Sequence, residues 1–115
     1  PDQLDELYRD MHTMKGSSQL FGFNDLGTSA HTMETCLDPI RKLHVKPNGK
    51  LLDALYKCID LIEKVVRNIS TRADSTTYLT EMNWILPQLI DSACSQFGTE
   101  FNLMKDMYLP SEVLE

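Results

Sequence analysis

Apolar positions in the first twenty or so residues recur at alternating intervals of three and four. They are Leu4, Leu7, Met11, Met14, Ser18 and Phe21. This spacing predicts one buried stripe on a helix that runs from about Asp2 to Phe21. Gly22 follows directly and suits the left-handed conformation in which many helices end.

A second apolar stripe begins a few residues later and fades near His44. Its positions are Leu26, Ala30, Met33, Leu37 and Ile40. Asn24 or Asp25 is placed to accept hydrogen bonds from the first free amides of this helix. We expect Pro39 to bend the helix, because proline removes an amide and crowds the carbonyl four residues earlier.

Two longer apolar patterns follow. The third helix is predicted to end near Thr71, and its stripe consists of Leu52, Leu55, Ile59, Ile62, Val66 and Ile69. After the polar stretch 72–77, a fourth pattern is broken by Pro87 and ends at Phe97; its stripe consists of Leu79, Met82, Leu86, Leu89 and Ala93. Four helices joined by short loops predict an all-α, antiparallel four-helix bundle over residues 1–97.

Residues 98–115 follow a different pattern. Phe101 and Leu103 alternate with Glu100 and Asn102, which is closer to a short strand than to a helix. We therefore interpret this stretch as a tail or as the start of a following domain.

Composition narrows the class of partner. With 115 residues, of which 42% are hydrophobic, the chain is large enough for one domain with one core. Its net charge of −6 argues against nucleic acid, whose phosphates are bound by clustered Lys and Arg. No stretch approaches the roughly eighteen apolar residues that a membrane span requires. The expected partner is another protein, with no direct membrane contact.

The cysteines indicate the compartment. Cys36, Cys58 and Cys94 are odd in number and far apart, with no Cys-x-x-Cys pair, which fits neither a disulfide framework nor a zinc site. A reducing, cytoplasmic location is expected. The start at Pro1 without a methionine suggests a piece of a longer protein, whose sensor or membrane segments would lie elsewhere.

The segment around His12 combines residue types that are unusual for a buried helix face. In a helix, His12, Lys15 and Gly16 lie three and four residues apart on one face. A glycine inside a helix costs about 1 kcal/mol relative to alanine, and the close approach of another surface to His12 would explain it. His44 has no such context and is interpreted as a surface residue.

The pattern His12-x-x-Lys15-Gly16 resembles the histidine-containing phosphotransfer (HPt) domains of two-component signalling and, more closely, the phosphotransfer domain of chemotaxis-type (CheA-like) histidine kinases. The matching segments, in the right order, cover about half the chain and are 7–9, 21–23, 31–38 and 51–55. The resemblance implies a phosphorelay intermediate. Its phosphoacceptor would be His12.

The resemblance also assigns roles to three neighbours of His12. Glu34, in the motif His31-x-x-Glu34, would hydrogen-bond His12 and fix its tautomer, as the acid does in catalytic triads. His31 would be a hydrogen-bonding neighbour. Lys15 would offer positive charge to the transferred phosphoryl group.

The implied partners are a response-regulator receiver domain and the ATP-binding domain of a histidine kinase. They would supply Mg²⁺ and ATP, so no cofactor is expected in this domain. Arg9 and Lys15 would face the acidic site of a receiver and steer docking. The residues expected to touch a partner are Tyr8, Arg9, Met11, Gly16 and Gln19.

Three other interpretations compete with phosphotransfer. A metal site would use His31-x-x-Glu34, but di-iron bundles need two such motifs and further carboxylates, and Lys15 would oppose a cation. A non-catalytic helical scaffold needs only the apolar stripes, but leaves the cost of Gly16 unexplained. Independent enzymatic activity is disfavoured, because the scattered glycines form no phosphate-binding loop.

The chain departs from the family in two respects, one of which is that the segment from Arg72 onward does not align with the family pattern. Phosphotransfer domains of this type usually carry a helix before the one with the histidine, and only eleven residues precede His12. We expect either that the preceding helix is missing from this sequence or that the fourth helix alone closes the bundle.

Overall fold

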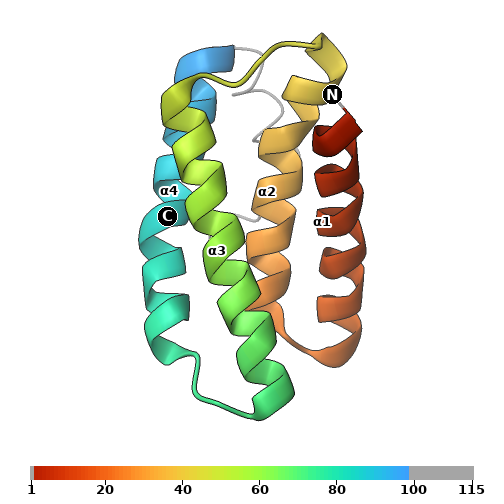
Figure 1. Ribbon diagram of the computed structural model, residues 1–115, viewed down its shortest axis with the longest axis vertical. Helices are drawn as coiled ribbons and strands as arrows, with labels where there is room; N and C mark the ends of the chain where they lie inside the picture. Colours follow the sequence, from red (N-terminus) through yellow and green to blue (C-terminus); the bar gives the residue numbers. More distant parts are fainter. Residues whose placement is uncertain (1, 99–115) are drawn as a thin grey trace.

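A computed structural model describes residues 2–98. It contains four α-helices, which are α1 (Asp2–Phe21), α2 (Asn24–Leu43), α3 (Gly49–Thr71) and α4 (Thr76–Phe97). Successive helices run in opposite directions (Figure 1), so the predicted all-α, antiparallel four-helix bundle is confirmed. The strand predicted around residues 100–103 lies outside the described residues, and the domain division at residue 98 stays a prediction.

A tight turn joins α1 to α2. Gly22 has a φ of 80°, its N–H bonds the carbonyl of Gln19, and the N–H of Phe23 bonds the carbonyl of Ser18 at 2.8 Å. These two bonds form the Schellman motif, with glycine at its left-handed position. The role predicted for Gly22 is therefore confirmed.

The cap predicted for α2 is wrong. Phe23, not Asn24 or Asp25, occupies the N-cap position, and no side chain caps the first amides. The Schellman turn needs only two residues between the helices, so α2 begins at Asn24, and Gly27 already donates to the Phe23 carbonyl at 2.9 Å. Asn24 and Asp25 therefore lie within the first turn instead of before it.

The helix α2 is the centre of the bundle, because it packs against each of the other three helices. The helix α1 packs along α2, whereas α4 packs on α3 and α2 and does not close the bundle against α1 to a comparable extent. At the α1–α2 contact, Gly27 is buried, and a Cβ there would lie 3.4 Å from the Ser18 Cβ. This close approach fixes which residues of α1 face α2.

Most predicted stripes form the core. The stripe of α2 is fully buried, as are Met82, Leu86, Leu89 and Ala93 of α4. The helix α4 continues through Pro87, so the predicted break is wrong; Pro87 is exposed. Pro39 also lies inside a continuous α2, and the bend expected there stays a prediction.

Three positions assigned to the buried stripes are exposed. Phe21 is 71% exposed, because it lies at the very end of α1, beyond the Ser18 contact. On α3, Val66 and Ile69 are exposed, because α3 packs on both α4 and α2 and turns a neighbouring set of positions inward. The buried residues of α3 are Leu51, Ala54, Leu55, Cys58, Leu61, Ile62 and Val65.

Between residues 2 and 98, no helix has the length and apolar character needed to cross a membrane.

Candidate functional site

The site lies where the middle of α1 meets α2. His12 points from α1 with 65% of its side chain exposed, and its Nδ1 lies 3.2 Å from Oε2 of Glu34 on α2. The two residues are 22 positions apart, so only the packing of the α1–α2 hairpin brings them together.

Glu34 has a second partner on α1. The Nζ of Lys15 lies 3.1 Å from both carboxylate oxygens of Glu34. The exposed fractions of the two side chains are 21% for Lys15 and 13% for Glu34. Lys15 is therefore ion-paired in the half-buried seam between the helices, and the contact with the phosphoryl group that the resemblance implies for it stays a prediction.

The contact with Glu34 bears on the imidazole of His12. An ionised carboxylate only accepts hydrogen bonds, so the neutral ring that bonds it carries its proton on Nδ1. The lone pair is then on Nε2. Because most of the ring is exposed, this arrangement can present a nucleophilic nitrogen to an incoming group.

His31 is half-buried on α2 beside this cluster. Burial lowers its pKa below the ordinary 6.5, the positive charge of Lys15 lowers it further, and Glu34 partly opposes both effects. Its ring forms no hydrogen bond with another residue of the described part of the chain. Its predicted role as a hydrogen-bonding neighbour therefore has no counterpart among the contacts of the described residues.

The predicted docking residues differ in accessibility. Arg9, Gly16 and Gln19 are exposed, and Tyr8 is half-buried. Met11 is 5% exposed and belongs to the core, which corrects its place in the docking set. Met11 lies two helical turns before the buried Ser18, on the same inward-facing side of α1.

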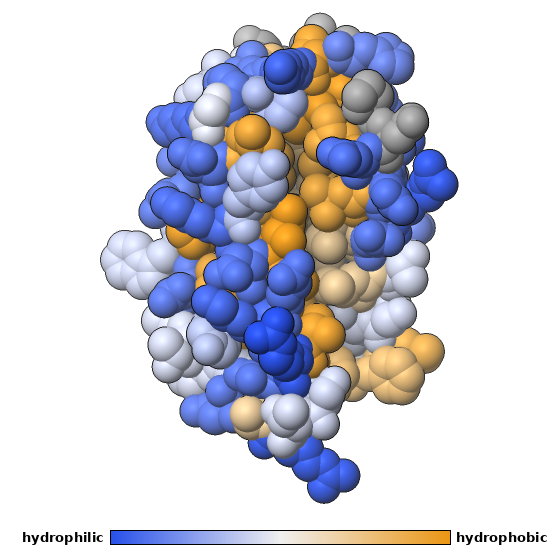
Figure 2. All heavy atoms as spheres, viewed as in Figure 1, coloured by the Kyte–Doolittle hydropathy of each residue, from blue (hydrophilic) through white to orange (hydrophobic). Residues whose placement is uncertain are grey.

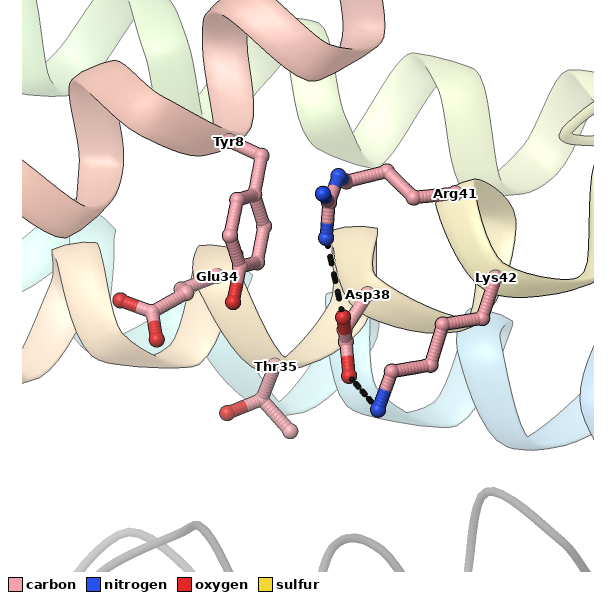
Figure 3. A pocket seen from close by; sticks show the side chains of 6 residues that line it. All are labelled: Tyr8, Glu34, Thr35, Asp38, Arg41 and Lys42. Atoms are coloured by element: carbon pink, nitrogen blue, oxygen red, sulfur yellow. Dashed lines mark hydrogen bonds and ion pairs between the residues drawn. The ribbon is translucent and has the colours of Figure 1, made fainter.

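A pocket that the sequence did not indicate lies beside Glu34. Figure 3 shows the Tyr8 ring descending from α1 between Glu34 and Arg41. The pocket has a volume of about 200 Å³, and its lining residues are Tyr8, Glu34, Thr35, Asp38, Arg41 and Lys42. It extends the site one to two turns along the helix pair.

Arg41 connects α1 and α2 at this pocket through three contacts. Its guanidinium lies 4.0 Å from the centre of the Tyr8 ring, and it donates to Asp5 at 2.8 Å and to Asp38 at 3.3 Å. The pKa of Tyr8 is raised by burial and by the nearby charges of Glu34 and Asp38. The i, i+3 spacing of Asp38 and Arg41 can be read from the sequence alone. The contacts of Arg41 with Asp5 and Tyr8 cannot, because they depend on how α1 packs on α2.

Metal-ligand geometry is not present in the described residues. No three His, Cys, Asp or Glu side chains between positions 2 and 98 are close enough to hold a metal ion.

The thiols of Cys36 and Cys58 are buried. Burial raises the pKa of both thiols, and it raises that of Cys58 to about 12.

Comparisons with known proteins agree with this geometry. A family model described as "Hpt domain" matches residues 1–68. The chain is 33% identical over 82 residues to the chemotaxis protein CheA of Borreliella burgdorferi, covering 71% of this chain and 9% of that protein. It is 31% identical over 78 residues to CheA of Bacillus subtilis, covering 68% of this chain and 12% of that protein.

A third relative is the sensor histidine kinase CheAY of Helicobacter pylori, 32% identical over 75 residues, with 65% of this chain and 9% of that protein covered. The chain thus spans only about a tenth of the length of these relatives. No solved structure matches it. The helical bundle, the His12–Glu34 pair and the family match together show that this chain belongs to the Hpt family, the phosphotransfer domains of two-component signalling.

Proposed function

We propose that His12 is the phosphoacceptor of a phosphorelay. The Nε2 lone pair forms a bond to phosphorus, and the bond from phosphorus to the donor oxygen breaks, with its electrons leaving on that oxygen. The Nδ1 proton stays on the ring throughout. The observation that carries this proposal is the 3.2 Å contact between Nδ1 and Glu34, which favours the tautomer with a free Nε2.

Glu34 would act as a positioning residue. It fixes the ring orientation and stabilises the positive charge that develops on the imidazole as the P–N bond forms. Lys15, paired with the same carboxylate, would hold Glu34 in place. Its effect on transfer would then run through Glu34, with direct contact to the phosphoryl group as the alternative that the resemblance implies.

The partners would supply the rest of the chemistry. Phosphoryl transfer depends mainly on positioning and charge stabilisation, so a domain with one exposed histidine suffices when its partner brings Mg²⁺ and the phosphate. The donor would be ATP on a histidine-kinase domain or the phosphorylated aspartate of a receiver. The acceptor would be a response-regulator receiver domain.

The test is phosphoryl transfer to the purified domain. It would be incubated with a chemotaxis-type kinase core plus ATP, and separately with phosphorylated receiver domains, and acid-labile phosphate would be located by intact mass and peptide mapping. We expect label on His12 and none in His12→Gln. The matched control is His44→Gln, because His44 is also exposed but lies at the end of α2, and it should label like the wild type.

The competing function is a helical scaffold without phosphotransfer. A scaffold would keep its partner's activity in His12→Gln, whereas a phosphorelay would lose it. Absence of label from every donor, with circular dichroism showing a folded helical domain, would overturn the phosphoacceptor role and favour the scaffold.

A further inference from the structure

The helix that carries His12 is held mainly by one neighbour. The helix α1 packs along α2 and makes only sparse contact with the rest of the bundle. On the face drawn in Figure 2, an apolar band runs down the middle of the molecule, between α3 and α1. Apolar packing is non-directional, so contacts of defined geometry between α1 and α2 are needed to fix the rotation of α1 about its axis.

Arg41 supplies such a contact towards the start of α1. Its Nε lies 2.8 Å from Oδ1 of Asp5 on α1, and its Nη1 lies 3.3 Å from Oδ1 of Asp38 on α2. A guanidinium is a planar, rigid fork, so it holds carboxylates in fixed directions. The two carboxylates belong to different helices, and Arg41 therefore links α1 to α2.

This link stands in register with the contact at the site. Asp5 precedes His12 by seven residues on α1. Arg41 follows Glu34 by seven residues on α2. Seven residues fall only about 20° short of two turns, and the two helices run in opposite directions (Figure 1). The two contacts are therefore successive cross-links on one side of the helix pair, about 10 Å apart along it, and a rotation of α1 that breaks one of them displaces the other.

The ring of Tyr8 lies between these two cross-links. Figure 3 shows it between Glu34 and Arg41. The guanidinium carbon of Arg41 lies 4.0 Å from the centre of the ring, and burial together with the nearby charge of Glu34 raises the pKa of the phenol. The ring thus covers the pocket side of a carboxylate that is only 13% exposed.

This cover matters because water competes for Glu34. An ionised carboxylate can accept about four hydrogen bonds, and it contacts Nδ1 of His12 and Nζ of Lys15. A hydrogen bond is electrostatically stronger where water is kept out. Admitting water to the pocket side would therefore weaken the hold of the carboxylate on the imidazole.

We propose that Arg41 is a positioning residue for phosphotransfer, which holds α1 in the rotation at which Glu34 meets Nδ1 of His12. It does so through its two carboxylate partners and through the ring of Tyr8. Its effect on the reaction runs through Glu34. The inference deepens the proposed function and rests on it.

The experiment reads the orientation of His12 separately from the stability of the fold. Nitrogen NMR gives the fraction of His12 with its proton on Nδ1, and phosphoramidate, a small phosphoryl donor that needs no protein docking, gives the rate of labelling. The test variant is Arg41→Met, studied without denaturant and shown to be folded by circular dichroism. The matched control is Lys64→Met, because Lys64 also pairs with a carboxylate, that of Asp60, and lies 5.5 Å from the ring centre of Tyr78, but on α3 and α4.

We expect Arg41→Met to lower the fraction of the Nδ1–H tautomer and to slow labelling by about threefold to tenfold, less than the roughly hundredfold that misplacement of a reacting group can cost. The maximal rate should fall while the KM for phosphoramidate stays the same. In Lys64→Met both readouts should match the wild type. Arg41→Lys, which keeps the charge but not the planar fork, should recover part of the rate, and it carries the test if Arg41→Met does not fold.

Two further comparisons locate the route of the effect. In a Glu34→Gln background, Arg41→Met should cost little more, because both changes act on the same contact. Tyr8→Phe keeps the ring and should lose less than Tyr8→Ser, which opens the pocket side of Glu34 to water.

Three results would contradict the proposal, and they can be told apart. A folded Arg41→Met with the tautomer and the labelling rate of the wild type would make Arg41 a purely structural residue. Losses that multiply in the Glu34→Gln background would show that Arg41 acts by a route other than Glu34. Failure of phosphoramidate to label His12 in the wild type would overturn the proposed function itself, and the tautomer fraction would still report whether Arg41 orients the ring.

Discussion

His12 on α1 and Glu34 on α2 are joined across the helix pair by a contact of 3.2 Å between Nδ1 and Oε2. The ring is mostly exposed and the carboxylate is mostly buried, with exposed fractions of 65% and 13%. The imidazole that we propose as the phosphoacceptor is thus accessible, while the carboxylate proposed to orient it is held between the helices. Any change that alters how α1 docks on α2 should alter this pair before it alters the helices.

Replacing Glu34 with Gln should slow phosphorylation of His12. The amide can donate a hydrogen bond to Nδ1, which favours the tautomer with the proton on Nε2 and removes the nucleophilic lone pair. We expect a loss of about tenfold to hundredfold, less than the roughly 10⁴-fold loss from the equivalent change in a buried triad, because His12 is exposed. The initial rate of labelling by phosphoramidate measures it.

The ring nitrogens of His12 provide a second readout of Glu34→Gln. Nitrogen NMR distinguishes a protonated from an unprotonated ring nitrogen, so the fraction of the Nδ1–H tautomer should fall in the variant. A structural role for Glu34 would lower stability without shifting this fraction. An unchanged tautomer together with an unchanged rate would contradict the positioning role.

Lys15→Met tests whether the lysine acts through Glu34 or directly on the phosphoryl group. In the structure its Nζ lies 3.1 Å from the carboxylate, so its removal in a Glu34→Gln background should cost little more. We expect the two losses to be non-additive, by about 0.5 to 1 kcal/mol in activation free energy. Multiplying losses in the double variant would instead support direct contact with the phosphoryl group.

Much of this site could be predicted from the sequence, and the signal that predicts it differs from one residue to the next. His12, Lys15 and Gly16 are close in sequence, so helical periodicity alone places them on one face. Glu34 was reached only through the family motif. Periodicity could not show that Lys15 pairs with Glu34, because the two residues are 19 positions apart in sequence and meet only through the packing of α1 on α2.

The fold errors have the same origin. The stripe of α3 was placed one position off, since a helix that packs on two neighbours buries a wide face and periodicity does not say where its centre lies. The cap of α2 was missed because the Schellman turn at Gly22 shortens the connection. Met11 was assigned to docking although its place in the apolar stripe of α1 already indicated burial.

Arg41→Met should destabilise the domain by about 1 to 2 kcal/mol. The change removes an ion pair with Asp5, a contact with nearly buried Asp38 and the stacking on Tyr8, each of which contributes up to about 1 kcal/mol in half-exposed positions. Urea denaturation measures the free energy of unfolding. Lys64→Met is the matched control, because the ion pair of Lys64 is with Asp60 on its own helix and its cation–π contact with Tyr78 is longer, at 5.5 Å, so its midpoint should shift less.

His31 should titrate below its ordinary pKa of 6.5, because burial and Lys15 both disfavour its charged form. The sign for stability follows. At neutral pH the ring is neutral in both states and contributes nothing, whereas below about pH 6.5 the unfolded chain takes up the proton first and stability falls. NMR titration of the ring protons gives the midpoint.

Two variants check the cause of this shift. Lys15→Met removes a charge that lowers the pKa of His31, so the midpoint should rise towards 6.5. His31→Gln should reduce the loss of stability between about pH 6.5 and about pH 5. A wild-type midpoint at or above 6.5 would show that Glu34 outweighs burial and Lys15.

Gly16→Ala should make the domain more stable and a poorer phosphate donor. The new methyl group meets nothing within 4 Å, so the helix gains about 0.5 to 1 kcal/mol from reduced backbone freedom in the unfolded chain. The same methyl group stands one turn from His12 on the exposed face of α1 and should slow transfer to a receiver while loading by phosphoramidate stays normal. Gly27→Ala is the comparison, because it brings the same gain in backbone entropy but places its methyl group 3.4 Å from the Ser18 Cβ, so its net gain in stability should be smaller. If Gly16→Ala lowered stability, an internal packing role would explain the glycine; if it raised stability without slowing transfer, the glycine would not serve docking.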